Sequence, residues 1–254
     1  MNRKSNLSTA PCTSGIRQRG VLLLVGAALF SGLLTAETPR AAADSSQARG
    51  NAAPISAPDK TYGWKNAPIT MEVFSDYQCP YCREFYDKTL RQVIANYVAS
   101  GKVYLIHRDF PLVGHKYSGE AARWANACAQ VGDFGTAELA LYDNQDLWGA
   151  DGNIGKFIAA SLPASDFKRV QALMQNGAMP APQATGSSID PLAGIVHPCP
   201  VDPYIAQDIK LGYQAHVNGT PTYVVTYKGQ HFSGPGSGVS WTVLKQFFDT
   251  LLQQ

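Results

Sequence analysis

The segment Cys79-Pro80-Tyr81-Cys82 places two cysteines three positions apart, a spacing that allows a reversible disulfide. An apolar stretch typical of a strand precedes it at 69–74, and a stretch with helical spacing follows it at 83–98. The first turn of a helix offers free backbone N–H groups and the positive end of the helix dipole, which stabilise a thiolate on Cys79. Pro80 fits this first turn, because its missing N–H costs no hydrogen bond there. The sequence therefore predicts a site of dithiol–disulfide exchange.

A zinc site and a purely structural local disulfide are the alternatives for this pair of cysteines. A zinc site needs a second pair of cysteine or histidine ligands at suitable spacing. The remaining residues Cys12, Cys128 and Cys199 form no second C-x-x-C, and the five histidines include no H-x-x-x-H pair. We therefore favour a redox site that uses neither a metal nor an organic cofactor.

Residues 1–43 are interpreted as a signal peptide or an N-terminal anchor. Arg17 and Arg19 precede a 14-residue apolar run at 21–34, which has the length of a signal-peptide core and is short for a bilayer span. Three alanines at 41–43 form a cleavage site of the A-x-A type, and an uncleaved anchor through residues 21–36 is the alternative. Both interpretations place the rest of the chain in the periplasm or another extracytoplasmic space.

Charge is distributed unevenly along the chain. Residues 1–43 contain five basic residues and one acidic residue, so the rest, with 16 basic and 18 acidic residues, carries a net charge of −2. This balance shows no signature of nucleic-acid binding. A hydrophobic content of 45% and an aromatic content of 10% are typical of a globular protein with a sizeable core.

Export affects the interpretation of the other cysteines, because disulfides persist outside the cytoplasm. Four cysteines follow the export segment, and Cys79 pairs with Cys82 by spacing. Cys128 and Cys199 then form either a second disulfide or two free buried thiols. We favour the disulfide, because stray thiols beside an exchanging pair invite wrong oxidation.

The chain is expected to contain a flexible linker at 44–60 and one folded domain at 61–254. A second strand at 102–109 follows the helix of the cysteine pair, which predicts a right-handed βαβ unit with two parallel strands. Residues from about 114 to 212 are expected to be a helical insertion, with helices at 119–131, 135–147, 152–160, 166–175 and 202–216. A hairpin at 222–227 and 230–233 and a closing amphipathic helix at 240–252 complete the domain.

The segment Val-Asn-Gly-Thr-Pro-Thr at 217–222 is expected to supply the second half of the site. Pro221 follows an Asn-Gly turn and begins a strand, which makes the Thr220–Pro221 bond a candidate for a cis peptide. Such a bond would present the backbone of Thr220 to an extended substrate segment, as in strand addition.

These motifs together resemble the DsbA-like branch of the thioredoxin superfamily. The residues that carry the resemblance are Phe-Ser-Asp-Tyr-Gln-Cys-Pro-Tyr-Cys at 74–82, Gly-Lys-Val at 101–103, Arg-Asp-Phe-Pro at 108–111 and the segment at 217–222. The resemblance extends over 66–252 and implies an α/β thioredoxin fold with an inserted helical domain. It also implies that Cys79 is the exposed nucleophile, Cys82 its buried partner and Pro221 the cis proline. The family often has cysteines near positions 128 and 199, which adds support to the second disulfide.

Pro80, Tyr81 and Glu72 are expected to tune the site, and Thr220 and Pro221 to bind the substrate. The best-known oxidase of the family has histidine where this chain has Tyr81, and an aliphatic residue where it has Thr220. Tyr81 cannot become a cation, so it offers less support to a Cys79 thiolate than a histidine would. Glu72 is a candidate proton acceptor for Cys82, although strict strand alternation would direct Val73 toward the site instead.

The resemblance implies a thiol–disulfide oxidoreductase that acts on cysteine-containing exported proteins and is recycled by a membrane redox partner. We expect it to form disulfides: a substrate thiolate attacks Cys79, and a second substrate thiol resolves the mixed disulfide. A reductase or isomerase is the alternative, and a non-catalytic peptide-binding domain is a further one. His107 is interpreted as a structural histidine. His115 is interpreted as a residue at the start of a helix, and a position facing the site across the insertion is the alternative.

Overall fold

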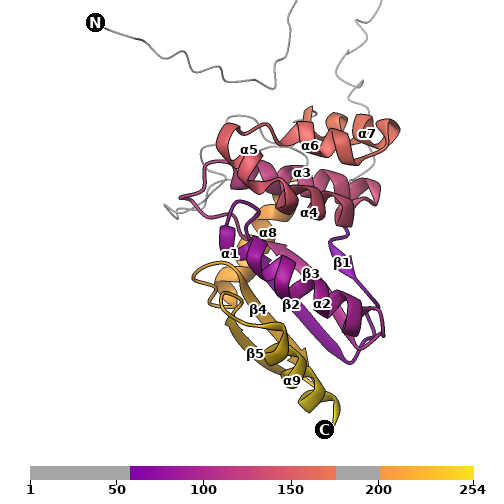
Figure 1. Cartoon of the computed structure of the whole chain (residues 1–254), viewed down its shortest axis with the longest axis vertical. Helices are drawn as coiled ribbons and strands as arrows, with labels where there is room; N and C mark the ends of the chain where they lie inside the picture. Colours follow the sequence, from indigo (N-terminus) through magenta and orange to yellow (C-terminus); the bar gives the residue numbers. More distant parts are fainter. Residues whose placement is uncertain (1–57, 176–200) are drawn as a thin grey trace, which may run out of the picture. The chain divides into compact units, whose positions relative to one another are not determined.

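The computed structural model describes residues 58–175 and 201–254. Its centre is a five-stranded sheet of order β1-β3-β2-β4-β5 (Figure 1). The strands are Thr61–Tyr62 (β1), Ile69–Ser75 (β2), Val103–Asp109 (β3), Thr222–Tyr227 (β4) and Gln230–Pro235 (β5).

Strand pairing brings the two predicted halves of the site together where β2 ends and β4 begins. Strands β2 and β3 are parallel, which confirms the predicted βαβ unit. Strand β4 runs antiparallel to β2 and pairs Thr222 with Phe74. The chain that leaves the end of β2 toward the cysteines therefore lies beside the chain that enters β4 from Pro221.

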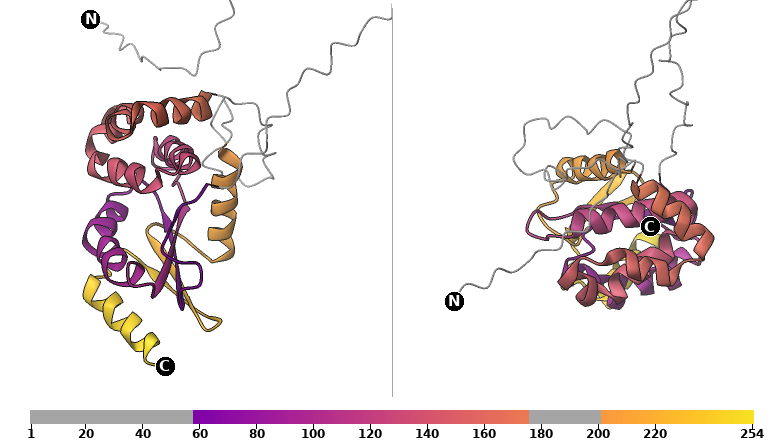
Figure 2. Two further views of the ribbon diagram at one scale, coloured as in Figure 1. Left: turned by 90° about the vertical axis from the view of Figure 1, so that its right-hand side faces the viewer. Right: turned by 90° about the horizontal axis from the view of Figure 1, so that it is seen from above.

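The helix that carries the cysteines covers one face of the sheet. It runs from Pro80 to Val98 and contains Pro80–Phe85 (α1) and Arg91–Val93 (α2), joined and followed by π-helical turns. The C-terminal helix Trp241–Leu252 (α9) lies on the same face, and the side chain of Ser240 caps its first turn by accepting from the Val243 N–H. Figure 2 shows both helices on one side of the strands.

Helix α8, at Asp202–Gln214, covers the opposite face of the sheet (Figure 2). Its Ile205 and Ile209 pack with Phe74 and Phe110 in a second buried cluster. A Cβ at Gly212 would lie 2.6 Å from the Phe110 ring, so the helix approaches the sheet closely. The predicted insertion extends to about residue 212, but the structure shows that this helix packs on the sheet and forms a layer of the core.

The other helices gather at one end of the sheet (Figure 1). They are Ser118–Val131 (α3), Phe134–Asp143 (α4), Gln145–Asp151 (α5), Ile154–Ser161 (α6) and Ala164–Gln175 (α7). The single helix expected at 135–147 is two helices, because Asn144 adopts non-helical angles of φ −111° and ψ 16° between them. Asparagine favours such a break, since its side chain competes for backbone hydrogen bonds.

The folded part begins earlier than the expected boundary at residue 61. Lys60, assigned to the linker, is only 5% exposed and forms ion pairs with Asp109 and Asp208. The export segment and residues 44–57 lie outside the described residues. Within 58–175 and 201–254, no helix combines the length and the apolar character needed to cross a membrane.

Candidate functional site

The two cysteines and the Thr220–Pro221 pair meet where β2 ends and β4 begins. Cys79 is the N-cap of α1, and its carbonyl accepts hydrogen bonds from the N–H groups of Cys82 (3.1 Å) and Arg83 (3.2 Å). The Thr220–Pro221 peptide bond is cis, as the sequence predicts. When Cys79 is protonated, its thiol donates to the Thr220 carbonyl at 3.5 Å, across 141 residues of sequence. The structure therefore assembles the predicted site from two distant segments.

Both sulfurs belong to buried residues, which corrects one expectation. Cys79 is 3% exposed and Cys82 is 1% exposed, so Cys79 is far less open than an exposed nucleophile would be. The segment that carries the Thr220 carbonyl lies over the Cys79 thiol. Tyr81 is 58% exposed and forms the outer surface of the motif.

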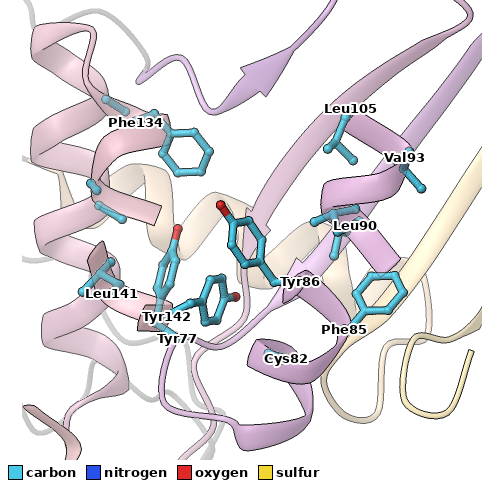
Figure 3. Packing of buried hydrophobic residues seen from close by; sticks show 14 of the residues in the cluster. Tyr77, Cys82, Phe85, Tyr86, Leu90, Val93, Leu105, Phe134, Leu141 and Tyr142 are labelled. Atoms are coloured by element: carbon cyan, nitrogen blue, oxygen red, sulfur yellow. The ribbon is translucent and has the colours of Figure 1, made fainter. Parts of the chain in front are cut away.

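The two thiols differ strongly in acidity. The pKa of Cys79 is lowered to about 6, first by a hydrogen bond with the Cys82 thiol. Burial opposes this shift, whereas the N–H of Cys82, the Thr220 side chain and the Tyr81 N–H add to it. Burial and the hydrogen bond to Cys79 raise the pKa of Cys82 well above its usual range. Figure 3 shows Cys82 among the aromatic rings of Tyr77, Tyr86 and Tyr142. At neutral pH the pair therefore holds one proton, on Cys82.

The carboxylate of Asp76 organises the loop between β2 and the cysteines. Asp76 is 1% exposed and accepts hydrogen bonds from the N–H groups of Gln78 (2.7 Å) and Leu112 (2.9 Å) and from the Ser118 hydroxyl. Its fourth contact is His115 Nδ1, at 2.7 Å. The Asp76 N–H donates to Cys82 Sγ at 3.4 Å. One buried carboxylate therefore joins the active-site loop to the segment that leads into α3.

Comparison with known proteins assigns the chain to a family. A family model described as Thioredoxin matches residues 56–237. The chain belongs to the thioredoxin family. A curated relative, the Na(+)/H(+) antiporter NhaA 3 of Salinispora tropica, is 32% identical over 89 residues, which are 35% of this chain. The chain spans only 13% of the length of that antiporter.

Solved structures show that this thioredoxin-family protein has the DsbA-like fold. Alpha-DsbA1 from Wolbachia pipientis matches with a TM-score of 0.57 and 18% identity over 77% of this chain and 91% of that one. BdbD from Bacillus subtilis matches with a TM-score of 0.54 and 16% identity over 78% and 97%. A thioredoxin-like oxidoreductase from Silicibacter pomeroyi DSS-3 matches with a TM-score of 0.53 and 23% identity over 78% and 93%. The helical layer α3–α7 is the inserted domain of this fold.

In this thioredoxin-family site, the inserted domain holds the cysteine loop through contacts that the sequence analysis missed. Gln145 of α5 donates from Nε2 to the carbonyls of Tyr77 (2.6 Å) and Cys79 (3.0 Å). Ser75 and Tyr142 share a hydrogen bond of 2.7 Å, and Ser75 lowers the pKa of Cys82. No local signal identifies these residues, because each becomes relevant only when the insertion folds over the sheet.

Glu72 does not lie at the cysteine pair, and its expected role as proton acceptor is wrong. Its carboxylate accepts from Arg108 Nε at 2.7 Å, and Arg108 also pairs with Asp208 of α8 at 3.1 Å. Val73 belongs to the buried cluster that contains Cys82. Because side chains alternate along a strand, Glu72 faces α8 and Val73 faces the cysteines.

His115, expected at the start of a helix or facing the site, contacts the buried carboxylate of Asp76. The hydrogen bond to Asp76 raises the pKa of His115. Burial partly opposes this rise, and the charges of Asp76 and Cys79 support it. Cys128, by contrast, is fully buried in α3, and burial raises its pKa to about 12. Cys199 lies outside the described residues, so the Cys128–Cys199 disulfide stays a prediction.

Thr220→Val is expected to raise the pKa of Cys79 above about 6. The Thr220 hydroxyl is buried, makes no hydrogen bond of normal geometry within the described residues, and lies close enough to lower the pKa of both thiols. Valine keeps the shape of the side chain and removes the hydroxyl. We expect this loss to raise the pKa of Cys79 by about one unit at most. The measurement is titration of the thiolate by its ultraviolet absorbance.

Thr222→Val is the matched control, because the Thr222 hydroxyl instead donates to the Gly219 carbonyl at 2.8 Å. An unchanged titration of Cys79 in Thr220→Val would show that the hydroxyl has no influence on the thiolate.

Proposed function

We propose that this chain is an extracytoplasmic thiol–disulfide oxidoreductase that forms disulfides in exported proteins through Cys79 and Cys82. The observation that carries the proposal is the pair of unequal thiols, with the pKa of Cys79 at about 6 and that of Cys82 raised, beside the Thr220 carbonyl. A reactive thiol of low pKa beside a buried resolving thiol is what exchange requires. The DsbA-like fold and the expected export segment support the same function.

The reaction transfers two electrons from the substrate to the protein. A substrate thiolate attacks Cys79 Sγ in the oxidised protein, a substrate–Cys79 bond forms, and the Cys82 sulfur leaves and takes up a proton. A second substrate thiolate then attacks the substrate sulfur of this mixed disulfide, and Cys79 leaves as a thiolate. A pKa of about 6 makes Cys79 a good leaving group at neutral pH, and this favours the second step.

A pocket of about 340 Å³ beside the motif supports binding of an extended substrate segment. It lies between the helix of the cysteines and the start of α9, and the exposed ring of Tyr81 is at its border. The lining residues are Tyr81, Glu84, Phe85, Lys88, Thr89, Gly236, Gly238, Val239, Ser240, Trp241 and Thr242. Because this lining mixes charged, hydroxyl and aromatic groups, we infer that substrates are peptides of mixed character.

Each turnover leaves Cys79 and Cys82 reduced, so the cycle needs an acceptor for two electrons. We propose a membrane redox partner that reoxidises the pair at the extracytoplasmic surface. This partner would use the same Cys79 sulfur as the substrate, because the pKa of Cys79 is about 6 whereas burial raises the pKa of Cys82 well above its usual range.

Cys82→Ser is expected to trap a mixed disulfide when it meets a peptide that contains a disulfide. The Cys79 thiolate attacks one peptide sulfur, the other leaves as a thiolate, and no resolving thiol is present to release the adduct. Cys79→Ser is the matched variant and should trap none, since the remaining Cys82 is buried and its pKa is raised. Mass spectrometry of the non-reduced adduct measures both. Absence of an adduct in Cys82→Ser would favour the non-catalytic peptide-binding alternative.

The direction of electron flow is tested by equilibrating wild-type protein with glutathione. We expect a reduction potential more oxidising than about −200 mV, in the range of proteins that donate disulfides. A potential near about −270 mV, which is typical of thioredoxin, would favour the reductase alternative.

A further inference from the structure

The pair of Asp76 and His115 lies immediately beside the reactive cysteines. Asp76 connects to both: its carbonyl accepts from the Cys79 N–H at 3.1 Å, and its N–H donates to Cys82 Sγ at 3.4 Å. Its carboxylate is fully buried and is 2.7 Å from His115 Nδ1. The His115 side chain is 28% exposed and reaches solvent.

A buried carboxylate at this position creates an electrostatic problem for the proposed function. Asp76 is needed to hold the loop, because it accepts from two backbone N–H groups and one hydroxyl. This carboxylate belongs to the residue whose backbone contacts both cysteines, and a negative charge there disfavours a second negative charge on Cys79. Tyr81 supplies no cation within the motif. A positive charge paired with Asp76 is the arrangement that lets both anions coexist.

We propose that His115, as an imidazolium held by Asp76, balances the charge of this carboxylate and thereby stabilises the Cys79 thiolate. His115 is a positioning residue, since it acts on the cysteines through Asp76. The inference rests on the proposed function and assigns to the segment before α3 the electrostatic support that Tyr81 cannot give.

The surroundings of His115 favour the charged form. Asp76 faces it from the loop after β2, and Cys79 faces it from the start of α1. Lys116 follows it in the chain, but its Nζ is turned to the Tyr117 hydroxyl at 2.9 Å and lies over the Tyr117 ring. In the described part of the chain, His115 Nε2 makes no hydrogen bond, and the exposed edge of the ring can exchange its proton with water. The imidazolium therefore has its negative partners on the cysteine side.

The test compares a neutral and a charged replacement of His115. Gln is a neutral donor to Asp76, so His115→Gln preserves the hydrogen bond and removes the charge, whereas His115→Arg preserves both. We expect His115→Gln to lower the acid dissociation constant of Cys79 by about three- to tenfold, because Asp76 then adds an uncompensated charge. The equilibrium with glutathione should shift about threefold or more toward the disulfide form, and His115→Arg should restore both values to within about twofold.

His231→Gln is the matched control, because His231 is exposed on β5 and pairs with Thr226 at 2.9 Å. An unchanged thiolate titration of Cys79 in His115→Gln would overturn the inference. A titration in His115→Arg that stays shifted as in His115→Gln would also overturn it, provided that all variants unfold at the same denaturant concentration. The proposed function fails separately, if wild-type Cys79 shows no low-pKa thiolate and no exchange with glutathione.

Discussion

Lys60→Met is expected to lower the free energy of unfolding by about 3–5 kcal/mol, because it leaves the buried carboxylate of Asp109 without its lysine and leaves Asp208 with Arg108 as its remaining cation. Lys60 pairs with Asp109 and, at 2.6 Å, with Asp208. Burial opposes the charge on Lys60, but the two carboxylates outweigh it and raise the pKa of Lys60. The same network reaches α3, where Asn126 donates to Asp109 at 2.6 Å. The substitution would therefore loosen the contacts of the sheet with α8 and with α3, and chemical denaturation measures the loss.

Lys88→Met is the control for this variant. Lys88 also pairs with a carboxylate, that of Glu84 at 2.7 Å, but both side chains are exposed and such a pair contributes about 0.5 kcal/mol or less. An unpaired buried carboxylate binds a proton more readily than an exposed one, so the deficit of Lys60→Met should shrink as the pH falls from 8 to about 5. A loss below about 1 kcal/mol at pH 8 would contradict the prediction.

Local patterns were sufficient to predict the elements that carry the cysteine pair. The C-x-x-C motif lies between a strand and a helix, Pro221 follows a cis peptide bond at the start of a strand, and the β-branched run at 222–227 forms β4, as local sequence predicted. Parallel pairing of β2 and β3 then follows from the crossover helix between them. These signals are local, and the structure agrees with them.

Features that depend on tertiary packing could not be predicted in the same way. Glu72 looked like a proton acceptor because it lies near the cysteines in sequence, but strand alternation directs it to α8. Lys60 looked like linker because its neighbours are small and polar, whereas its partners are 49 and 148 residues away. The contact of Gln145 with the Cys79 carbonyl spans 66 residues. Such contacts leave no trace in local composition.

The reduction potential of the Cys79–Cys82 pair is expected to change its pH dependence near pH 6. Below the pKa of Cys79 the reduced form holds two protons for two electrons, so the potential falls by about 59 mV per pH unit. Above it the reduced form holds one proton, on Cys82, and the slope is about 30 mV per unit. The lowered pKa stabilises the reduced protein above pH 6, and this contribution is lost as the pH falls through 6. At pH 7 it favours the reduced form about tenfold over a dithiol of ordinary pKa, or about 30 mV.

Equilibration with glutathione between pH 5 and pH 8, corrected for the protonation of glutathione itself, measures both slopes. The variants give a second test, because the break should move to higher pH in Thr220→Val and in His115→Gln by the same amount as the thiolate titration moves. His231→Gln should leave it in place. A single slope of about 59 mV per unit across the whole range would mean that Cys79 stays protonated at neutral pH. In that case the helix N-terminus, Thr220 and His115 together would not produce a thiolate, and the second step of the proposed reaction would lose its good leaving group.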